Sequence, residues 1–330
     1  MFWQSITGQL LVGILANLLF VLVLTAIGIV YVRAVLTRRS RPLRRLLGVG
    51  GRLPGSIQIL VSSIYVVKGG TLGVRVERTG FYGPVMNQGE YVSALRLAEA
   101  IQTRPAARLL RALLDQLGLL DAVHDPLDCS IVFGPQYVDS PDGEPVDPQQ
   151  YTVPDMSGNG AVVERILRAL ATPGVYILVG GPVYNAAVHY VLTHLRERTR
   201  FRFQVHDASG SPDRGIAVSG YRQDGGEEFF RHVPDRPDHT GAASDYFIVQ
   251  KISRFGPGES TVFLCSGLSS IGTAMAVGLL ATRWEDLERE FHAEDFALLY
   301  RFGNGRDIAV PTAEDVDIAL ATAERVWPRP

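Results

Sequence analysis

An uncharged apolar stretch near the N-terminus constrains this chain more than any other feature. No charged residue lies between Leu10 and Val32, and Leu, Val, Ile, Ala and Phe dominate this segment. At a rise of about 1.5 Å per residue, a helix of this length crosses a hydrocarbon core of about 30 Å. The sequence therefore predicts one transmembrane helix, with residues 1–33 as the membrane anchor and lipid contact through residues 10–32.

Basic residues on one side of the apolar stretch predict its orientation. No lysine or arginine precedes the stretch, whereas seven arginines follow it closely: Arg33, Arg38, Arg39, Arg41, Arg44, Arg45 and Arg52. The positive-inside rule then puts the N-terminus outside and the bulk of the chain in the cytoplasm, as a single-pass protein of the cell (inner) membrane. A cleaved secretory signal is disfavoured because it needs a basic start and a shorter apolar core. Binding of anionic lipid head groups is a second role open to the arginines.

The remaining chain reads as a basic and glycine-rich linker followed by one large domain. Glycines crowd the end of the linker, 34–55, between Gly48 and Gly55. Residues 56–330 are expected to form a cytoplasmic α/β domain, which could consist of two fused Rossmann-like halves, 56–206 and 207–330. A share of 46% apolar and 20% charged residues is typical of a globular protein.

Apolar runs alternate with helical patterns along this domain. Strands are expected at 57–67, 129–133, 175–179, 202–206, 246–252, 261–265, 296–302 and 308–310, with a hairpin within 207–241. Helices are expected at 90–102, 105–117, 161–170, 185–196, 273–281, 284–291 and 313–326. Strands that alternate with helices indicate a mostly parallel Rossmann-like sheet flanked by helices, the α/β class. Ligands of such sheets bind beyond the carboxyl ends of the strands.

Glycine turns follow several of the expected strands and supply the candidate ligand-binding residues. The first turn contains Gly180 and Gly181 and leads to Asn185, where a helix N-terminus favours an anion such as phosphate. An ordinary strand-to-helix turn capped by Asn185 explains the same residues. A third, weaker candidate is Gly134, which follows the strand at 129–133 and could face the same pocket.

The second turn is rich in hydroxyl groups and precedes a helix of small residues. Its candidate residues are Ser266, Gly267, Ser269, Ser270, Gly272 and Thr273. Such groups suit a phosphate, a ribose or a base edge, although close packing of the helix on the sheet also calls for small residues. Asp245 and Lys251 flank a strand and could contact a base or an anion; a capping carboxylate and a solvated lysine are the simpler interpretation.

The sequence does not decide whether the protein is an enzyme, and it favours a non-enzymatic role. It contains neither the G-x-G-x-x-G spacing nor the Walker lysine, and we find no nucleophile elbow, catalytic triad or metal-ligand spacing. We therefore expect no metal and no cofactor. Cys129 and Cys265 lie in apolar runs and are expected to be buried thiols. No basic face interleaved with aromatic residues indicates binding to nucleic acid.

Several short motifs together resemble a class of prokaryotic domains. They are Gly180-Gly181-Pro182 with Asn185, Asp245-Tyr246 before a strand, and Ser266-Gly267 through Ile271-Gly272-Thr273. They look like the Rossmann-like nucleotide-sensing domains of antiviral signalling effectors, in which a bound second messenger triggers a transmembrane or toxic module. The resemblance implies a transmembrane effector of antiviral defence whose ligand is a cyclic or linear nucleotide. Our leading hypothesis is a membrane-anchored sensor of a nucleotide-like ligand that forms a homo-oligomer and acts through self-association of its helix. The alternatives are a membrane-tethered nucleotide or nucleoside hydrolase or transferase, and a scaffold for a protein partner.

Overall fold

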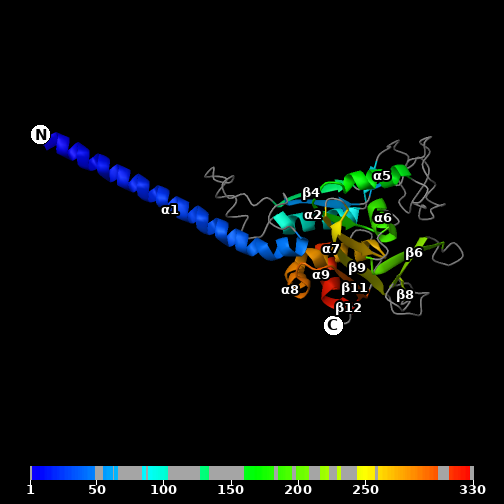
Figure 1. Cartoon of the computed structure of the whole chain (residues 1–330). Coiled ribbons are helices and arrows are strands. Elements are labelled where there is room, and N and C mark those ends of the chain that lie inside the picture. The colour runs from blue at the N-terminus through cyan, green and yellow to red at the C-terminus, as the bar shows by residue number, and fades with distance from the viewer. Residues whose placement is uncertain are drawn as a thin grey trace, which may run out of the picture.

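A computed structural model describes most of the regular elements of the chain. The described residues are 2–48, 55–61, 63–65, 84–86, 88–102, 127–133, 160–181, 185–194, 198–207, 216–222, 229–231, 244–256, 259–303 and 312–327. Helix α1 (Phe2–Leu47) is a straight rod that projects from a domain of strands and helices, and the C-terminus lies in that domain (Figure 1). The predicted helix at 105–117, the strand at 308–310 and Gly134 lie outside the described residues.

A seven-stranded sheet forms the centre of the domain, with the strand order β12-β11-β9-β10-β5-β1-β4. Its strands are β1 (Gly55–Val61), β4 (Leu127–Phe133), β5 (Val175–Val179), β9 (Asp245–Phe255), β10 (Ser260–Gly267), β11 (Phe296–Phe302) and β12 (Glu324–Trp327). The pairs β4–β1, β1–β5 and β5–β10 are parallel. The pairs β10–β9, β9–β11 and β11–β12 are antiparallel.

The predicted mostly parallel Rossmann-like sheet is therefore wrong. The central sheet is mixed, and across all described sheets the antiparallel pairs are the majority because the smaller sheets contain only such pairs. The cause is the short connection between β9 and β10, since parallel neighbours need a crossover of a dozen or more residues. Only the half formed by β10, β5, β1 and β4 follows the expected crossover pattern.

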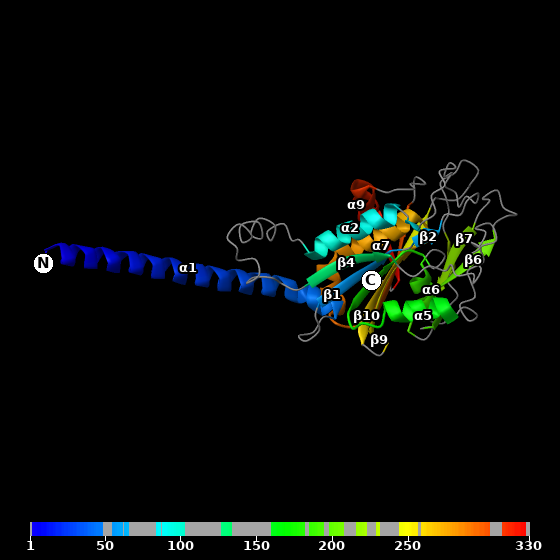
Figure 2. The same ribbon diagram turned by 90° about the horizontal axis from the view of Figure 1, so that it is seen from above.

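Helices cover both faces of the sheet, as Figure 2 shows. Alternate residues of each strand face opposite sides, so Ile57 and Ile177 join one core cluster and Leu60 and Leu178 join the other. The first face carries α2 (Gln88–Gln102), α7 (Ser270–Thr282), α8 (Trp284–Phe291) and α9 (Ala313–Thr322), and the second carries α5 (Gly160–Ala169) and α6 (Ala186–His194). The fold is thus a three-layer arrangement with a core on each side of the sheet.

Two smaller sheets accompany the central one. Strands β2 (Ser63–Tyr65) and β3 (Pro84–Met86) form a short antiparallel pair. Strands β6 (Phe201–Asp207), β7 (Ile216–Arg222) and β8 (Phe229–Arg231) form a three-stranded antiparallel sheet, which confirms the hairpin predicted within 207–241. Phe201 at the start of β6 packs against Ile248 and Leu299 of the central sheet.

The end of α1 belongs to the core of the domain. Leu43, Leu46 and Leu47 are buried in the cluster that also contains residues of α2, α7 and α8. An ion pair between Arg45 and Glu288 of α8, with 3.0 Å between Nη2 and Oε1, adds a polar contact beside them. Residues 34–47 of the predicted linker are thus a continuation of α1, and we call the segment 43–47 the root of α1.

The predicted transmembrane helix is the second correction to the expected fold. Helix α1 covers the segment concerned and is apolar over much of its length. Within the part of the chain that the structure describes, however, no helix combines the length with the apolar character that crossing a bilayer requires.

We predict that Leu46→Ala destabilises the whole domain, whereas Leu19→Ala does not. The Leu46 side chain has 0% exposure, so its truncation removes core contacts and should lower the free energy of unfolding by about 2–5 kcal/mol. The Leu19 side chain is 64% exposed, and its truncation should change that free energy by less than about 0.5 kcal/mol. Calorimetry of the full chain in an uncharged detergent measures both. Equal effects of the two substitutions on the free energy of unfolding would contradict the burial of the root of α1 in the core.

Candidate functional site

The parallel strands of the central sheet end side by side along one edge. In the register of the sheet, Val61 of β1 lies opposite Phe133 of β4 and Val179 of β5, and Val179 lies opposite Cys265 of β10. Strand β9 begins at this edge with Asp245, because it runs antiparallel to β10. The sheet therefore brings together the two predicted turns and Asp245, and we call this region the carboxyl edge.

The turn after β5 is held by backbone and amide hydrogen bonds. The N–H of Gly180 donates to the carbonyl of Cys265 at 3.1 Å, and Gly180 has a φ of 115° that favours glycine. The buried Asn185 amide donates to the carbonyls of Val179 at 2.8 Å and Leu60 at 3.3 Å. Its Oδ1 accepts from the N–H groups at the start of α6, at 3.0 and 3.3 Å. Asn185 therefore caps α6 and ties it to two strands.

The hydroxyl groups of the turn after β10 also bind within the protein. The Ser266 hydroxyl donates to the carbonyl of Gly180 at 2.6 Å, which joins the two turns. The Thr273 hydroxyl accepts from the N–H of Gly267 at 3.2 Å. The Ser269 hydroxyl donates to the Asp245 carboxylate and accepts from the N–H of Gly272 at 3.1 Å, which caps α7. These side chains position the backbone of the carboxyl edge; the Ser270 side chain lies outside the described residues.

Two of the glycines in this turn are required by close packing. A Cβ atom on Gly267 would lie 2.2 Å from the carbonyl carbon of Gly272 and 2.2 Å from the nitrogen of Thr273. A Cβ atom on Gly272 would lie 2.9 Å from the carbonyl oxygen of Tyr246. Gly181 differs from both: among the described residues apart from its chain neighbours, a Cβ atom would meet the carbonyl oxygen of Gly267, at 3.7 Å, which is an ordinary contact. The described contacts therefore leave room for a methyl group at Gly181.

Several backbone N–H groups of the carboxyl edge bind within the protein, as those of Gly180, Gly267 and Gly272 do. The N-termini of α6 and α7 lie at adjacent turns that Ser266 joins, and helix N-termini favour anions. The sequence predicted ligand contacts through backbone groups at the first turn and through hydroxyl groups at the second, and the hydroxyls of Ser266, Ser269 and Thr273 bind within the protein. Their pairing with distant backbone groups, such as Ser266 with Gly180, has no signal in the local sequence.

Lys251 lies apart from the carboxyl edge and is fully buried. It sits opposite Phe263 and Phe296 in the sheet, six residues along β9 from Asp245, and its Nζ donates to the carbonyl of Ala293 at 2.7 Å. Burial lowers the pKa of Lys251 to about 8, against the opposing charge of Asp295. The expectation of a solvated lysine is thus wrong, and Lys251 does not join Asp245 in one site.

The two cysteines are buried free thiols, as expected. Burial raises the pKa of Cys265 to about 12, so its thiol stays protonated and a poor nucleophile at neutral pH. Among the described residues, no group of three or more His, Cys, Asp and Glu side chains could hold a metal ion.

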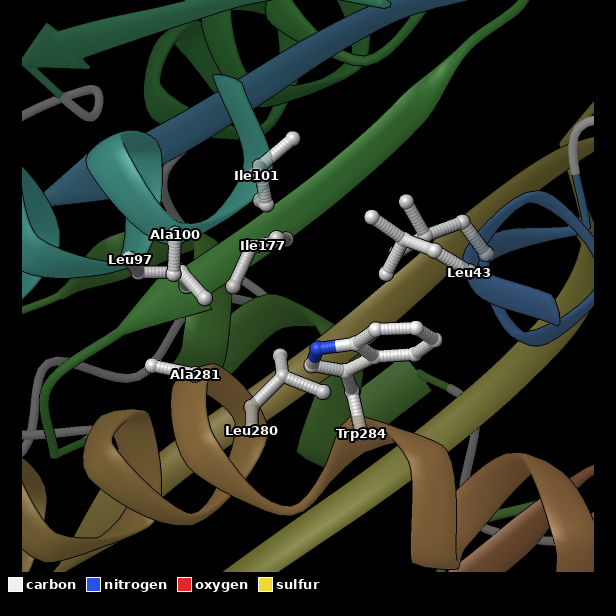
Figure 3. A pocket seen from close by; sticks show the side chains of 9 residues that line it. Leu43, Leu97, Ala100, Ile101, Ile177, Leu280, Ala281 and Trp284 are labelled. Atoms are coloured by element: carbon white, nitrogen blue, oxygen red, sulfur yellow. The ribbon is translucent and has the colours of Figure 1, made fainter. Parts of the chain in front are cut away.

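A small apolar pocket marks the joint between α1 and the domain (Figure 3). Its lining comes from four helices and one strand: Leu43, Leu47, Leu97, Ala100, Ile101, Ile177, Leu280, Ala281 and Trp284. The cavity volume of about 10 Å³ is close to the minimum for one water molecule, so the pocket does not hold a larger ligand. This joint could not be predicted from the sequence, because the glycines after Leu47 indicated a linker.

Comparisons with protein families, curated proteins and solved structures found no match to this chain. The site therefore rests on its own geometry.

We predict that Gly267→Ala and Gly181→Ala differ sharply in stability. The clash at Gly267 is with backbone atoms that cannot rotate away, so the substitution should lower the free energy of unfolding by about 3 kcal/mol or more. Gly181→Ala should stay within about 1 kcal/mol of the wild type, since its new methyl group makes an ordinary contact. Thermal unfolding of the two variants measures the difference. A stable Gly267→Ala variant would contradict the described packing of the two turns.

Proposed function

We propose that the protein is a membrane-associated sensor that binds a nucleotide-like anion at the carboxyl edge and responds through α1. The observation that carries the proposal is the course of α7. This helix begins beside Gly267 at the carboxyl edge, and its last turn contributes Leu280 and Ala281 to the joint with Leu43 and Leu47. One helix of 13 residues, about 20 Å long, therefore links the candidate site to the root of α1.

The ligand contacts in this proposal are main-chain amides rather than hydroxyl side chains. Ser266, Ser269, Thr273 and Asn185 already bind protein groups, so their role is to position the backbone. Gly181 lies beside the start of α6 and the turn that leads into α7. A phosphate group suits this position because it accepts hydrogen bonds from several N–H groups at once. A nucleotide would add its base and ribose outside this contact.

The membrane contact is supported by the exposure of α1 around its whole circumference. Each residue from Leu18 to Leu24 is a large apolar residue, and the exposed fractions of these seven side chains run from 48% to 64%. Seven consecutive residues cover nearly two turns, so every side of the helix is apolar. One partner helix would cover a single stripe and leave the other apolar sides exposed. We therefore infer that α1 contacts a lipid membrane through residues 10–32.

The response in this proposal is a change in self-association. A ligand shifts such an equilibrium only if it binds the two assembly states with different affinity. A small movement of α7 on ligand binding would move the joint with Leu43 and Leu47, and the continuous helix α1 would carry that movement to the apolar segment. Copies of the protein held in one membrane would then meet in a different orientation.

We predict that a nucleotide or cyclic dinucleotide raises the melting temperature of the full chain in an uncharged detergent. At one hundred times the dissociation constant, binding contributes about 2.7 kcal/mol. Gly181→Trp should abolish this shift because the indole would occupy the position proposed for the ligand, and Leu167→Trp on the exposed surface of α5 is the matched control that should retain it.

Two outcomes would contradict this proposal. If a folded Gly181→Trp variant shows an undiminished shift in melting temperature, the ligand does not bind at the carboxyl edge. The second outcome is a folded wild-type chain that no nucleotide, cyclic dinucleotide or nucleoside stabilises. That result would favour a scaffold for a protein partner, because the polar side chains of the carboxyl edge are already paired within the protein.

A further inference from the structure

We infer that two copies of this chain pair through strand β4, so that their central sheets join edge to edge. The order of the described strands ends at β4 on one side of the domain and at β12 on the other (Figure 1). The partner is a second copy of the chain, and the contact surface is the outer side of β4. The inference rests on the proposed self-association and names the surface that mediates it.

The β12 edge carries features that prevent a further strand from pairing. It has four residues, and two of them, Glu324 and Arg325, are charged. Glu324 forms an ion pair with Arg301, with 2.7 Å between Oε2 and Nη2. The register of β12 against β11 shifts between Leu299 and Tyr300, as it does at a β-bulge. Short length, charge and irregular pairing are the means by which proteins block edge-to-edge association.

The β4 edge lacks these features. All seven residues of β4 pair with β1 in one unbroken register, from Leu127 opposite Gly55 to Phe133 opposite Val61. Its sequence, LDCSIVF, contains no lysine, glycine or proline, and Asp128 is its one charged residue. None of the described strands lies on its other side. A long, regular edge strand of this kind is a template for another strand.

The second face of the sheet is partly open at β4. Ile131 packs against the core on the first face, so the alternate residues Ser130 and Val132 lie on the second. Both are exposed, and the apolar Val132 is exposed to 39%. A neighbouring strand would shield Val132, because side chains directly opposite each other on one face have Cβ atoms about 4.5–5.5 Å apart.

A second copy of β4 matches this edge in length and in charge. Around a two-fold axis the two strands run antiparallel, and full pairing of the seven residues places Ser130 opposite Ser130 of the second copy. The same register places Asp128 opposite Val132, so no like charges face each other. The two Asp128 positions are then about 14 Å apart along the strands, beyond the screening length of about 8–10 Å.

The first test is disulfide formation between copies at Ser130. The Cα atoms of opposite residues in antiparallel strands are about 4.5–5.5 Å apart, which a disulfide can span. We expect Ser130→Cys to form a covalent dimer when the full chain is oxidised in an uncharged detergent. Leu167→Cys, at a site of α5 that is 44% exposed, is the matched control and should form little covalent dimer. The wild type measures any contribution of the buried Cys129 and Cys265.

The second test determines the register from charge. Val132→Asp places a carboxylate opposite Asp128 of the second copy and should weaken the dimer, whereas Val132→Lys places an ammonium group there and should not. The dimer contains this pair twice, so the dissociation constants of the two variants should differ by about tenfold or more. Val132→Asp combined with Asp128→Lys should restore the association. Sedimentation of the full chain in the same detergent measures all three variants.

Two results would overturn the inference. One is a Ser130→Cys chain that forms covalent dimers no more readily than the Leu167→Cys chain, and the other is equal dissociation of the Val132→Asp and Val132→Lys chains. If the chain then still sediments as an oligomer, self-association uses another surface and the proposed function stands. A wild-type chain that sediments as one copy with and without a nucleotide would overturn the proposed self-association and the pairing through β4 together, and would leave this edge to a strand of another protein.

Discussion

The burial of three leucines at the end of α1 is the interaction on which the rest of the structure depends. Leu43, Leu46 and Leu47 fill the space between α2, α7 and α8, so the long helix and the domain share one core. Each buried leucine is worth about 2–5 kcal/mol against alanine, a large share of the stability of an ordinary domain. A fragment that starts at Ser56 lacks all three side chains and exposes their neighbours.

The carboxyl edge shows how a site can be built from the backbone. Its polar side chains hold the strands and helices together, with Ser266 joining the two turns and Ser269 joining α7 to β9. Gly267 and Gly272 allow the first turn of α7 to approach the sheet closely. Because α7 then runs to the root of α1, the packing that shapes the edge also shapes the joint.

Much of the local structure could be predicted from the sequence, because apolar periodicity and caps are local signals. The strand Val175–Val179, the helix Trp284–Phe291 and the strand Phe296–Phe302 have the expected bounds. Strand direction could not be predicted as well, since it depends on how distant segments pair. The apolar pattern at 313–326 predicted one helix, and this prediction is wrong at its end. The helix ends at Thr322, and the edge strand Glu324–Trp327 follows at once. The hydrogen-bond partners of the candidate side chains could not be predicted, because they lie up to 125 residues away in the sequence.

Hydrogen exchange of the amides of Leu46 and Leu47 in the full chain tests the central claim most directly. If the root of α1 is part of the core, these amides exchange only when the domain opens as a whole, and their protection matches that of the amides of Met275 to Leu279 in α7. Exchange of the root amides near the rate of an unfolded chain, with α7 still protected, would show that α1 ends before the domain and would contradict the proposed coupling between the candidate site and α1.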